Sequence, residues 1–254
     1  MKIVWAIAIT NYKEIIRERL LYGILVIAAL FTAVSFFLAT VSLDQNARVM
    51  QNTGVAAIHF MTLFICVFVA TNSVHRDFER RALYFLFPKP ISRTQYIFGK
   101  YLGFVLLTLT TLAILGGLFS VGAAFLSPSI LPAVGVNLLF SFLEISLLLA
   151  VALLFASFTA PLNAALYTLA LFVIGNGQST IKNFVDKLDN NALTYITNGV
   201  YYLLPNLEKF NLREATLYDV RVPLAAIAWA LFYWLVFTSL SLYLASRVMH
   251  KQEL

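Results

Sequence analysis

The chain has 254 residues, of which 61% are hydrophobic and 12% charged, and its mean hydropathy is +0.84. Soluble domains carry about 25% charged residues, so this composition excludes an ordinary soluble enzyme and indicates one integral membrane domain, residues 1–254, with no room for an ATPase or kinase module. The net charge of +6 does not indicate nucleic-acid binding, because 12 of the 18 basic residues lie in three segments that flank apolar stretches and are expected to contact membrane lipid.

The N-terminal residues are predicted to form an amphipathic helix in the inner membrane interface. Apolar and charged side chains alternate there at helical spacing. The apolar positions are Ile3, Ile7, Tyr12, Ile15 and Ile16, and the charged positions are Lys13, Glu14, Arg17 and Glu18. We expect this helix to meet the first transmembrane helix at an elbow.

Six apolar stretches predict six transmembrane helices. Five are long enough to cross about 30 Å of hydrocarbon, and they lie at residues 20–41, 55–74, 102–126, 136–160 and 223–245. The stretch 162–175 is short for a crossing, but Pro161 and Asn163 break the preceding helix and permit a tight turn. The chain is therefore expected to be an all-α protein that crosses the membrane six times.

The distribution of basic residues predicts the orientation. Four lie before the first span, six between residues 76 and 100, and two in the C-terminal tail. These twelve basic residues are expected to be cytoplasmic, which places both termini on the cytoplasmic side of the cell (inner) membrane. The five basic residues between 182 and 221 are matched by five acidic residues, and a loop of that length is weakly constrained by charge.

Residues 75–103, HRDFERRALYFLFPKPISRTQYIFGKYLG, form a basic segment with two prolines between two apolar stretches. Its charges predict that the segment lies in water on the cytoplasmic side. The aromatic and leucine side chains between 78 and 87 are able to give a short helix one apolar face for a partner, and Pro88 and Pro90 stiffen the link to the next span. The alternative is that these aromatics lie among lipid headgroups and the arginines contact lipid.

Glu144 lies near the middle of the fourth predicted span, in the sequence LLFSFLEISLLL. An ionised carboxylate at that depth costs about 2.5–3.5 kcal/mol even on the mildest insertion scales, so we expect it to face protein or water. Three roles are open: a polar point in a path through the membrane, a contact between two copies, or a hydrogen bond to a hydroxyl, either a neighbouring one such as Ser141 or one on another span. His59, near the outer end of its span, is expected to be interfacial rather than a ligand.

The segment between residues 177 and 222 is predicted to form a helical hairpin on the external side. It contains two apolar stripes at helical spacing, and short helices that return toward the membrane are more plausible than a structureless loop of that length. The first stripe is Ile181, Phe184, Val185 and Leu188, and the second is Leu193, Ile196, Val200, Leu203, Leu204 and Leu207.

Catalytic and cofactor-binding motifs are not found in the sequence. Gly99-Lys100 lacks the upstream glycine of a phosphate-binding loop, so we expect no ATP hydrolysis by this chain. The three histidines are scattered, and no metal site or cofactor is predicted.

The segment 75–103 resembles the cytoplasmic loop of permease subunits of ATP-binding-cassette (ABC) transporters of the type-2 exporter family. In that family an acidic and basic start, a leucine-rich stretch, Pro-Ile-Ser-Arg and a Gly-Lys pair join the second and third spans. Here these elements read Glu79-Arg80-Arg81, 83–87, Pro90-Ile91-Ser92-Arg93 and Gly99-Lys100-Tyr101-Leu102-Gly103. Arg81-Ala82 stands where the family often has Gly-Thr. The six spans, the N-terminal helix and the external hairpin extend the likeness over nearly the whole chain.

The resemblance implies a permease that is not itself an enzyme and is driven by a separate cytoplasmic ABC ATPase. Two copies of that ATPase, which binds ATP and Mg²⁺, are expected to work with this chain and a second permease, identical or homologous. The loop is expected to act as a coupling helix between spans 2 and 3. The residues expected to couple to the ATPase are Arg76, Glu79, Arg80, Arg81, Tyr84, Pro88, Pro90, Ser92, Arg93 and Lys100.

Two alternatives from other classes are consistent with the sequence. In the first alternative, the chain is a membrane anchor that passes ATPase motion to an external or periplasmic partner through the segment 177–222. In the second, it is an intramembrane enzyme in which Glu144 and His59 act together. A silent transport assay with partner binding intact indicates the first, and activity without ATP indicates the second. The identity of the cargo does not follow from the sequence.

Overall fold

The computed structural model describes residues 2–17, 19–41, 46–79, 92–186, 199, 204–217 and 223–251, and every regular element in this part of the chain is helical. Five of the longer helices are α1 (Lys2–Ile16), α2 (Arg19–Val41), α3 (Asn46–Glu79), α5 (Arg93–Leu126) and α6 (Leu131–Ala156). The others are η1 (Pro128–Ile130), α7 (Pro161–Asn176), α8 (Gln178–Asp186), η2 (Leu207–Phe210), α10 (Arg213–Leu217) and α11 (Leu224–Lys251).

A helix occupies each of the six stretches that the sequence predicts to cross the membrane. By length and apolar composition, four of the described helices are able to span it: α3, α5, α6 and α11. The apolar part of α2, Leu25–Phe37, and helix α7 are shorter. The chain is thus a multi-pass membrane protein, and the number of six crossings remains a prediction.

The helix boundaries differ from the predicted ones at the end of α3 and at the start of α5. Helix α3 continues to Glu79 and α5 already begins at Arg93, whereas the apolar stretches end at residue 74 and begin at residue 102. A helix does not need to stop where its side chains become polar, because its backbone hydrogen bonds are satisfied in water and in lipid alike. The polar ends of α3 and α5 are therefore available to contact each other and α1.

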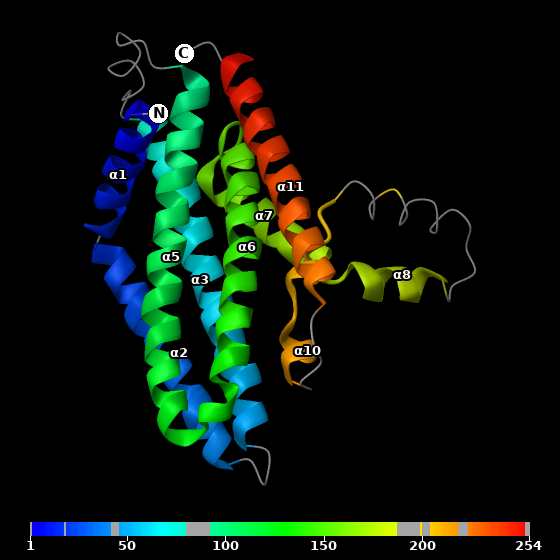
Figure 1. Cartoon of the computed structure of the whole chain (residues 1–254). Coiled ribbons are helices and arrows are strands. Elements are labelled where there is room, and N and C mark those ends of the chain that lie inside the picture. Colours follow the sequence, from blue (N-terminus) through cyan, green and yellow to red (C-terminus); the bar gives the residue numbers. More distant parts are fainter. Residues whose placement is uncertain are drawn as a thin grey trace.

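Helix α6 forms the centre of the bundle and contacts α3, α5, α7 and α11. Its residues Leu147, Leu148 and Leu149 are fully buried, as expected for a helix covered on all sides. Helix α1 packs against α5, and α2 packs against α3 (Figure 1). The predicted N-terminal helix is thus confirmed as a helix on the outside of the bundle.

Four helix ends lie together at one end of the bundle: the start of α1, the end of α3, the start of α5 and the end of α11 (Figure 1). This arrangement agrees with the prediction that the N-terminal segment, the segment 75–103 and the C-terminal tail share one side of the membrane. The end of α2, the start of α3 and helix η1 lie at the opposite end.

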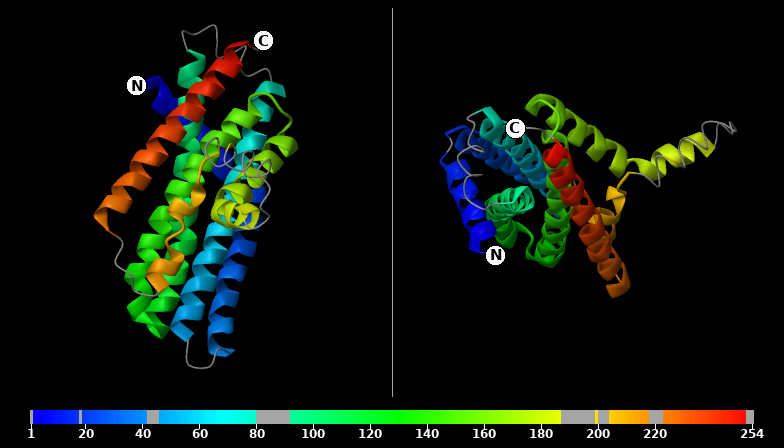
Figure 2. Two further views of the ribbon diagram at one scale, coloured as in Figure 1. Left: turned by 90° about the vertical axis from the view of Figure 1, so that its right-hand side faces the viewer. Right: turned by 90° about the horizontal axis from the view of Figure 1, so that it is seen from above.

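The predicted external hairpin is only partly described. Three residues of its first stripe lie in α8, which leads away from the bundle (Figure 2) and exposes 41% of Ile181 and 64% of Phe184, and Leu188 lies outside the described residues. Most of the second stripe lies outside the described residues. After it, η2 returns to contact α6 and α7, and α10 contacts α3 and α6.

Candidate functional site

The predicted coupling residues are only partly described. Arg80, Arg81, Tyr84, Pro88 and Pro90 lie outside the described residues, as does the side chain of Glu79 at the end of α3. The remaining four flank this segment, with Arg76 half-buried on the last turns of α3 and Ser92, Arg93 and Lys100 at the start of α5. The structure therefore describes the two stems between which the predicted coupling helix lies.

Ser92 begins α5 as its N-cap. Its Oγ accepts a hydrogen bond from the backbone N–H of Gln95 at 3.2 Å, and its own N–H donates to Gln95 Oε1 at 3.2 Å. This reciprocal capping box satisfies two backbone N–H groups, those of Ser92 and Gln95, that the start of a helix otherwise leaves unpaired. The Ser-Arg pair of the loop motif thus marks a defined helix start.

Arg93 and Thr94 join the start of α5 to the end of α11. The Arg93 guanidinium donates a hydrogen bond to the carbonyl oxygen of Met249, and the hydroxyls of Thr94 and Ser246 lie 2.9 Å apart. Arg93 was predicted to contact an ATPase, and that role stays a prediction. The described contact shows that its side chain also connects two helices of the same chain.

Lys100 corrects the prediction that the whole segment 75–103 lies in water, because it is only 3% exposed. Its Nζ contacts Asp77 Oδ2 at 2.7 Å on α3, Asn11 Oδ1 at 2.8 Å on α1 and Ser73 Oγ at 2.9 Å on α3. An ammonium group has three N–H donors, so all three are satisfied. The ring hydroxyl of Tyr96 also donates to Asp77 Oδ2 at 2.5 Å.

We call Lys100, Asp77, Asn11, Ser73 and Tyr96 the stem cluster. A charged pair is tolerated in a buried site when its Coulomb attraction is supplemented by further hydrogen bonds, and the stem cluster supplies them. It joins α1, the last turns of α3 and the first turns of α5.

Two glycines of the Gly-Lys-Tyr-Leu-Gly motif explain how α1 comes close enough to reach Lys100. A Cβ atom at Gly103 would lie 2.6 Å from Asn11 Nδ2 and 3.0 Å from the Ala8 carbonyl oxygen. A Cβ atom at Gly99 would lie 2.7 Å from Ile7. The absence of side chains at both positions therefore lets α1 lie directly on α5.

A second polar site lies between α3, α6 and α7, around Glu144. Glu144 is 3% exposed, which confirms that it faces protein rather than lipid. Asn176 Nδ2, on α7, donates a hydrogen bond to Glu144 Oε1 at 2.7 Å, so the partner is on another helix rather than at Ser141. His59 Nε2, on α3, lies 3.6 Å from Glu144 Oε2.

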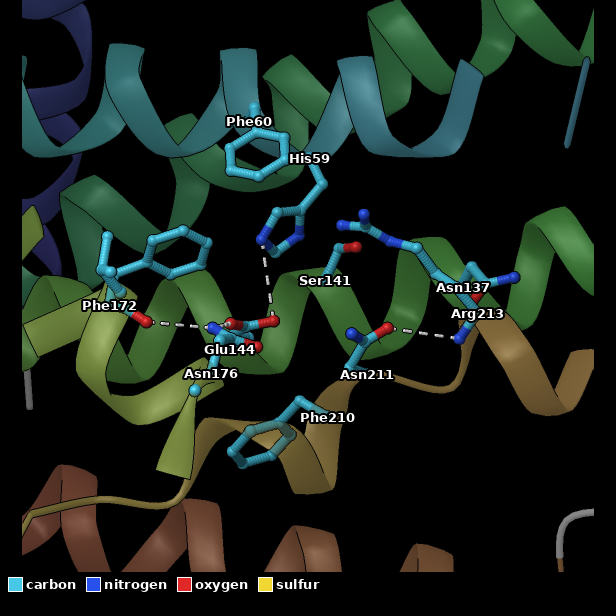
Figure 3. Close-up of a pocket in the computed structure, with 12 residues that line it drawn as sticks. His59, Phe60, Asn137, Ser141, Glu144, Phe172, Asn176, Phe210, Asn211 and Arg213 are labelled. Atoms are coloured by element: carbon cyan, nitrogen blue, oxygen red, sulfur yellow. Dashed lines mark hydrogen bonds and ion pairs between the residues drawn. The ribbon is translucent and has the colours of Figure 1, made fainter. Parts of the chain in front are cut away.

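His59 was expected to be interfacial rather than a ligand, and its depth in the membrane stays a prediction, but the structure shows it buried among helices. It is 2% exposed and packs against Phe172, with ring centroids 5.8 Å apart. The sequence position alone does not show this burial, because it depends on α6 and α7 packing against α3. Figure 3 shows His59, Glu144, Asn176 and Arg213 directed toward one cavity.

Sequence reasoning missed the partners of both sites. Asn11, Ser73 and Asp77 in the first site, and Asn176 in the second, come from segments more than about 20 residues away from the side chains that they contact. Arg213, which lines the second site, comes from a segment further along the chain. The available signal was a polar residue on an otherwise apolar helix face, as at Asn11. It marks a residue that needs a partner without saying which one.

The fold and the two sites together define the class of protein as a multi-pass helical membrane domain with two buried polar sites. A family model described as ABC-2 family transporter protein matches residues 5–199, which is more than half of the chain. The chain therefore belongs to the ABC-2 family of transporter proteins, as its coupling-loop motif predicts. No curated protein matches it.

Family membership makes the chain a permease, the transmembrane subunit of an ABC transporter. Members of this family associate with an ABC ATPase subunit, and their transmembrane subunits are typically not catalytic. The partner's copy number, the second permease and the cargo do not follow from the match.

Proposed function

We propose that this chain, as one permease domain of residues 1–254, couples ATP hydrolysis on a separate cytoplasmic ATPase subunit to export of a substrate across the inner membrane. The match to the ABC-2 family over residues 5–199 carries this proposal. ATP and Mg²⁺ are bound by the partner ATPase, and the permease supplies the moving membrane part. Both termini and the segment 80–91 face the cytoplasm in this proposal.

The stem cluster supports a route for the coupling. Any partner that moves the segment 80–91 moves its two stems, the end of α3 and the start of α5. Lys100 connects these stems to each other and to α1, while Arg93 and Thr94 connect α5 to α11. Because packed, hydrogen-bonded elements shift as bodies rather than bending continuously, a push on the segment is transmitted to four helices together.

The permease is proposed to work as a pair, identical or homologous, with two ATPase copies. The centre of the single bundle is filled by α6, whose Leu147, Leu148 and Leu149 are fully buried. This filling favours a pathway at the interface of two permeases over one through a single chain. ATP-driven closure of the ATPases would then open that interface outward.

Co-purification of the ATPase tests the proposal. A protein with ABC ATPase motifs should co-purify with the wild-type chain and be lost from the triple variant Glu79→Ala, Arg80→Ala and Arg81→Ala. The matched control is Lys209→Ala, a change at an exposed basic residue of η2, far in the sequence from residues 79–81, and this variant should retain the ATPase. Full ATPase binding by the triple variant would contradict the proposed contact.

One observation favours a second candidate function, a membrane anchor that passes ATPase motion to an external partner. Helix α8 leads away from the bundle with Ile181 and Phe184 exposed. In that case, replacing both residues by serine abolishes capture of the external partner while ATPase binding persists and no cargo moves. The intramembrane enzyme is supported only by the His59–Glu144 approach of 3.6 Å, and activity of the isolated chain without ATP would identify it.

A further inference from the structure

A cavity of about 310 Å³ lies beside Glu144, and this volume is within the range of small-molecule sites. Helices α3, α6 and α7 form its walls, and residues 210–213 of the external segment cover it (Figure 3). Its polar lining residues are His59, Asn137, Ser141, Glu144, Asn176, Asn211 and Arg213. So many polar groups inside a membrane domain mark a site for a polar ligand.

The cavity contains one acidic and one basic group that do not form an ion pair with each other. Glu144 and Arg213 interact electrostatically, yet the structure shows no contact within 4.0 Å between their charged atoms. Burial lowers the pKa of the Arg213 guanidinium, and the charge of Glu144 opposes this shift without forming a direct ion pair. A ligand that brings a positive group to Glu144 and a negative group to Arg213 would compensate both charges.

His59 supplies a hydrogen-bonding atom that nothing described satisfies. Its Nδ1 is buried and has no hydrogen-bond partner among the described residues, although the side chain is only 2% exposed and lines the cavity. A buried polar atom without a partner costs free energy. A negatively charged oxygen of a ligand near Arg213 would accept a hydrogen bond from the N–H at this nitrogen.

The side of the cavity toward the bilayer is apolar. Phe60 on α3 is 41% exposed and Val173 on α7 is 67% exposed, and both line the cavity. Phe60 and Phe172 pack edge to face with ring centroids 5.7 Å apart, and the Arg213 guanidinium lies over the Phe60 ring at 5.9 Å. Exposed side chains on helices of a membrane domain meet lipid chains, so a polar interior here opens sideways onto an apolar surface.

A metal ion fits this lining less well than an organic ligand. Of the residue types that commonly bind metals, only His59 and Glu144 line the cavity, and the described residues contain no group of three that would hold an ion. A purely anionic ligand would face the Glu144 carboxylate, and a purely cationic one would face Arg213.

We propose that this cavity binds the headgroup of a phospholipid that carries both a primary amine and a phosphate, with phosphatidylethanolamine as the simplest example. The ammonium group lies at Glu144, the phosphate lies between Arg213 and His59 Nδ1, and the acyl chains leave past Phe60 and Val173. The amine must be primary, because a quaternary amine has no N–H to donate to the carboxylate. Binding does not require an ATPase, so this site goes beyond the proposed transport function.

Competition binding to the purified full-length chain tests the proposal. Phosphatidylethanolamine with a fluorophore on one acyl chain is bound in mixed detergent micelles, and unlabelled lipids displace it while fluorescence anisotropy is recorded. Unlabelled phosphatidylethanolamine should compete about tenfold better than phosphatidylcholine, phosphatidylglycerol or diacylglycerol, the effect of one charge-assisted hydrogen bond. Equal competition by all four lipids would overturn the proposal.

Two substitutions separate the ends of the headgroup. Glu144→Gln should remove the preference for phosphatidylethanolamine over phosphatidylglycerol, and Arg213→Gln should weaken both by about tenfold while diacylglycerol is unaffected. Lys209→Gln is the matched control, because Lys209 is an exposed base of the same external segment that lies over the Tyr233 ring instead of the cavity. Unchanged selectivity in both cavity variants would refute the assignment.

A third substitution tests the site without replacing a buried polar residue, so a folding defect in the two cavity variants does not decide the result. Val173→Trp blocks the side opening from an exposed position and should lower phosphatidylethanolamine binding, whereas Val121→Trp on α5, at a position 61% exposed, should not. Competition by free phosphoethanolamine as strong as that by the lipid would refute a lipid ligand. Loss of ATPase co-purification with lipid binding intact would count against the proposed function and leave this site standing.

Discussion

The stem cluster and the Glu144 cavity bury charge in the same membrane domain in opposite ways. Lys100 has a partner for each of its three N–H groups, at 2.7, 2.8 and 2.9 Å, and is only 3% exposed. Glu144 has one close hydrogen bond, a histidine at 3.6 Å, and a cavity of about 310 Å³ beside it.

This difference separates a charge that holds helices together from a charge that is available to a ligand. A fully satisfied buried pair stabilises one arrangement of its neighbours, and removal of one member leaves the other uncompensated. A partly satisfied group gains most from a molecule that completes its contacts. The following predictions test whether the two regions differ as described, in order of decreasing effect on stability.

The largest effect is expected from Lys100→Met. The change leaves Asp77 buried without its cation and should lower the free energy of unfolding by about 3–5 kcal/mol, measured by denaturant titration in detergent micelles. The double variant Lys100→Met with Asp77→Leu should recover most of the loss, because Ser73 still donates to Asn11 at 3.1 Å. If the single variant is as stable as the wild type, the stem cluster does not hold the helices together.

Gly103→Ala is expected to have the next largest effect. The added methyl group meets Asn11 Nδ2 and the backbone oxygen of Ala8, so α1 must move, at a cost of about 1–3 kcal/mol. The control is Gly117→Ala on the same helix, where a Cβ atom meets nothing within 4 Å. Thermal unfolding followed by tryptophan fluorescence measures both, and equal midpoints would show that α1 is not held by close packing.

Glu144→Gln should change the free energy of unfolding by no more than about 1 kcal/mol. Glutamine keeps an oxygen that accepts the hydrogen bond from Asn176 and removes a buried charge. The same denaturant titration as for Lys100→Met makes the comparison direct. A loss as large as that of Lys100→Met would assign Glu144 to structure rather than to ligand binding.

Thr94→Ala should have the smallest effect, less than about 0.5 kcal/mol. The Thr94–Ser246 contact of 2.9 Å is exposed to solvent, so water replaces the lost hydrogen bond. Differential scanning fluorimetry alongside the wild type is sufficient. A clear drop in the midpoint would show that the start of α5 depends on α11 more than its exposed contacts imply.

Much of the architecture was predictable from residue order. The apolar stretches located the helices, the alternation of Ile7 and Ile15 with charged residues located α1, and the basic segment with Pro90 and Gly99-Lys100 indicated the family. Glu144 was predictable as a residue that faces protein, because its cost in lipid does not depend on its partner. The helix ends at Glu79 and Arg93 were not predictable from the sequence, because a helix does not need to end where its side chains become polar.

The sequence by itself determined the class of this protein, because the length and apolarity of a segment decide whether it can reside in a membrane. Only the tertiary structure decided what its buried charges do. The sequence predicts a solvated Lys100 and an interfacial His59. The packing of α1, α3, α5, α6 and α7 shows that both side chains are buried and which groups they contact. Partner choice depends on distances between segments far apart in the chain, and local patterns do not contain those distances.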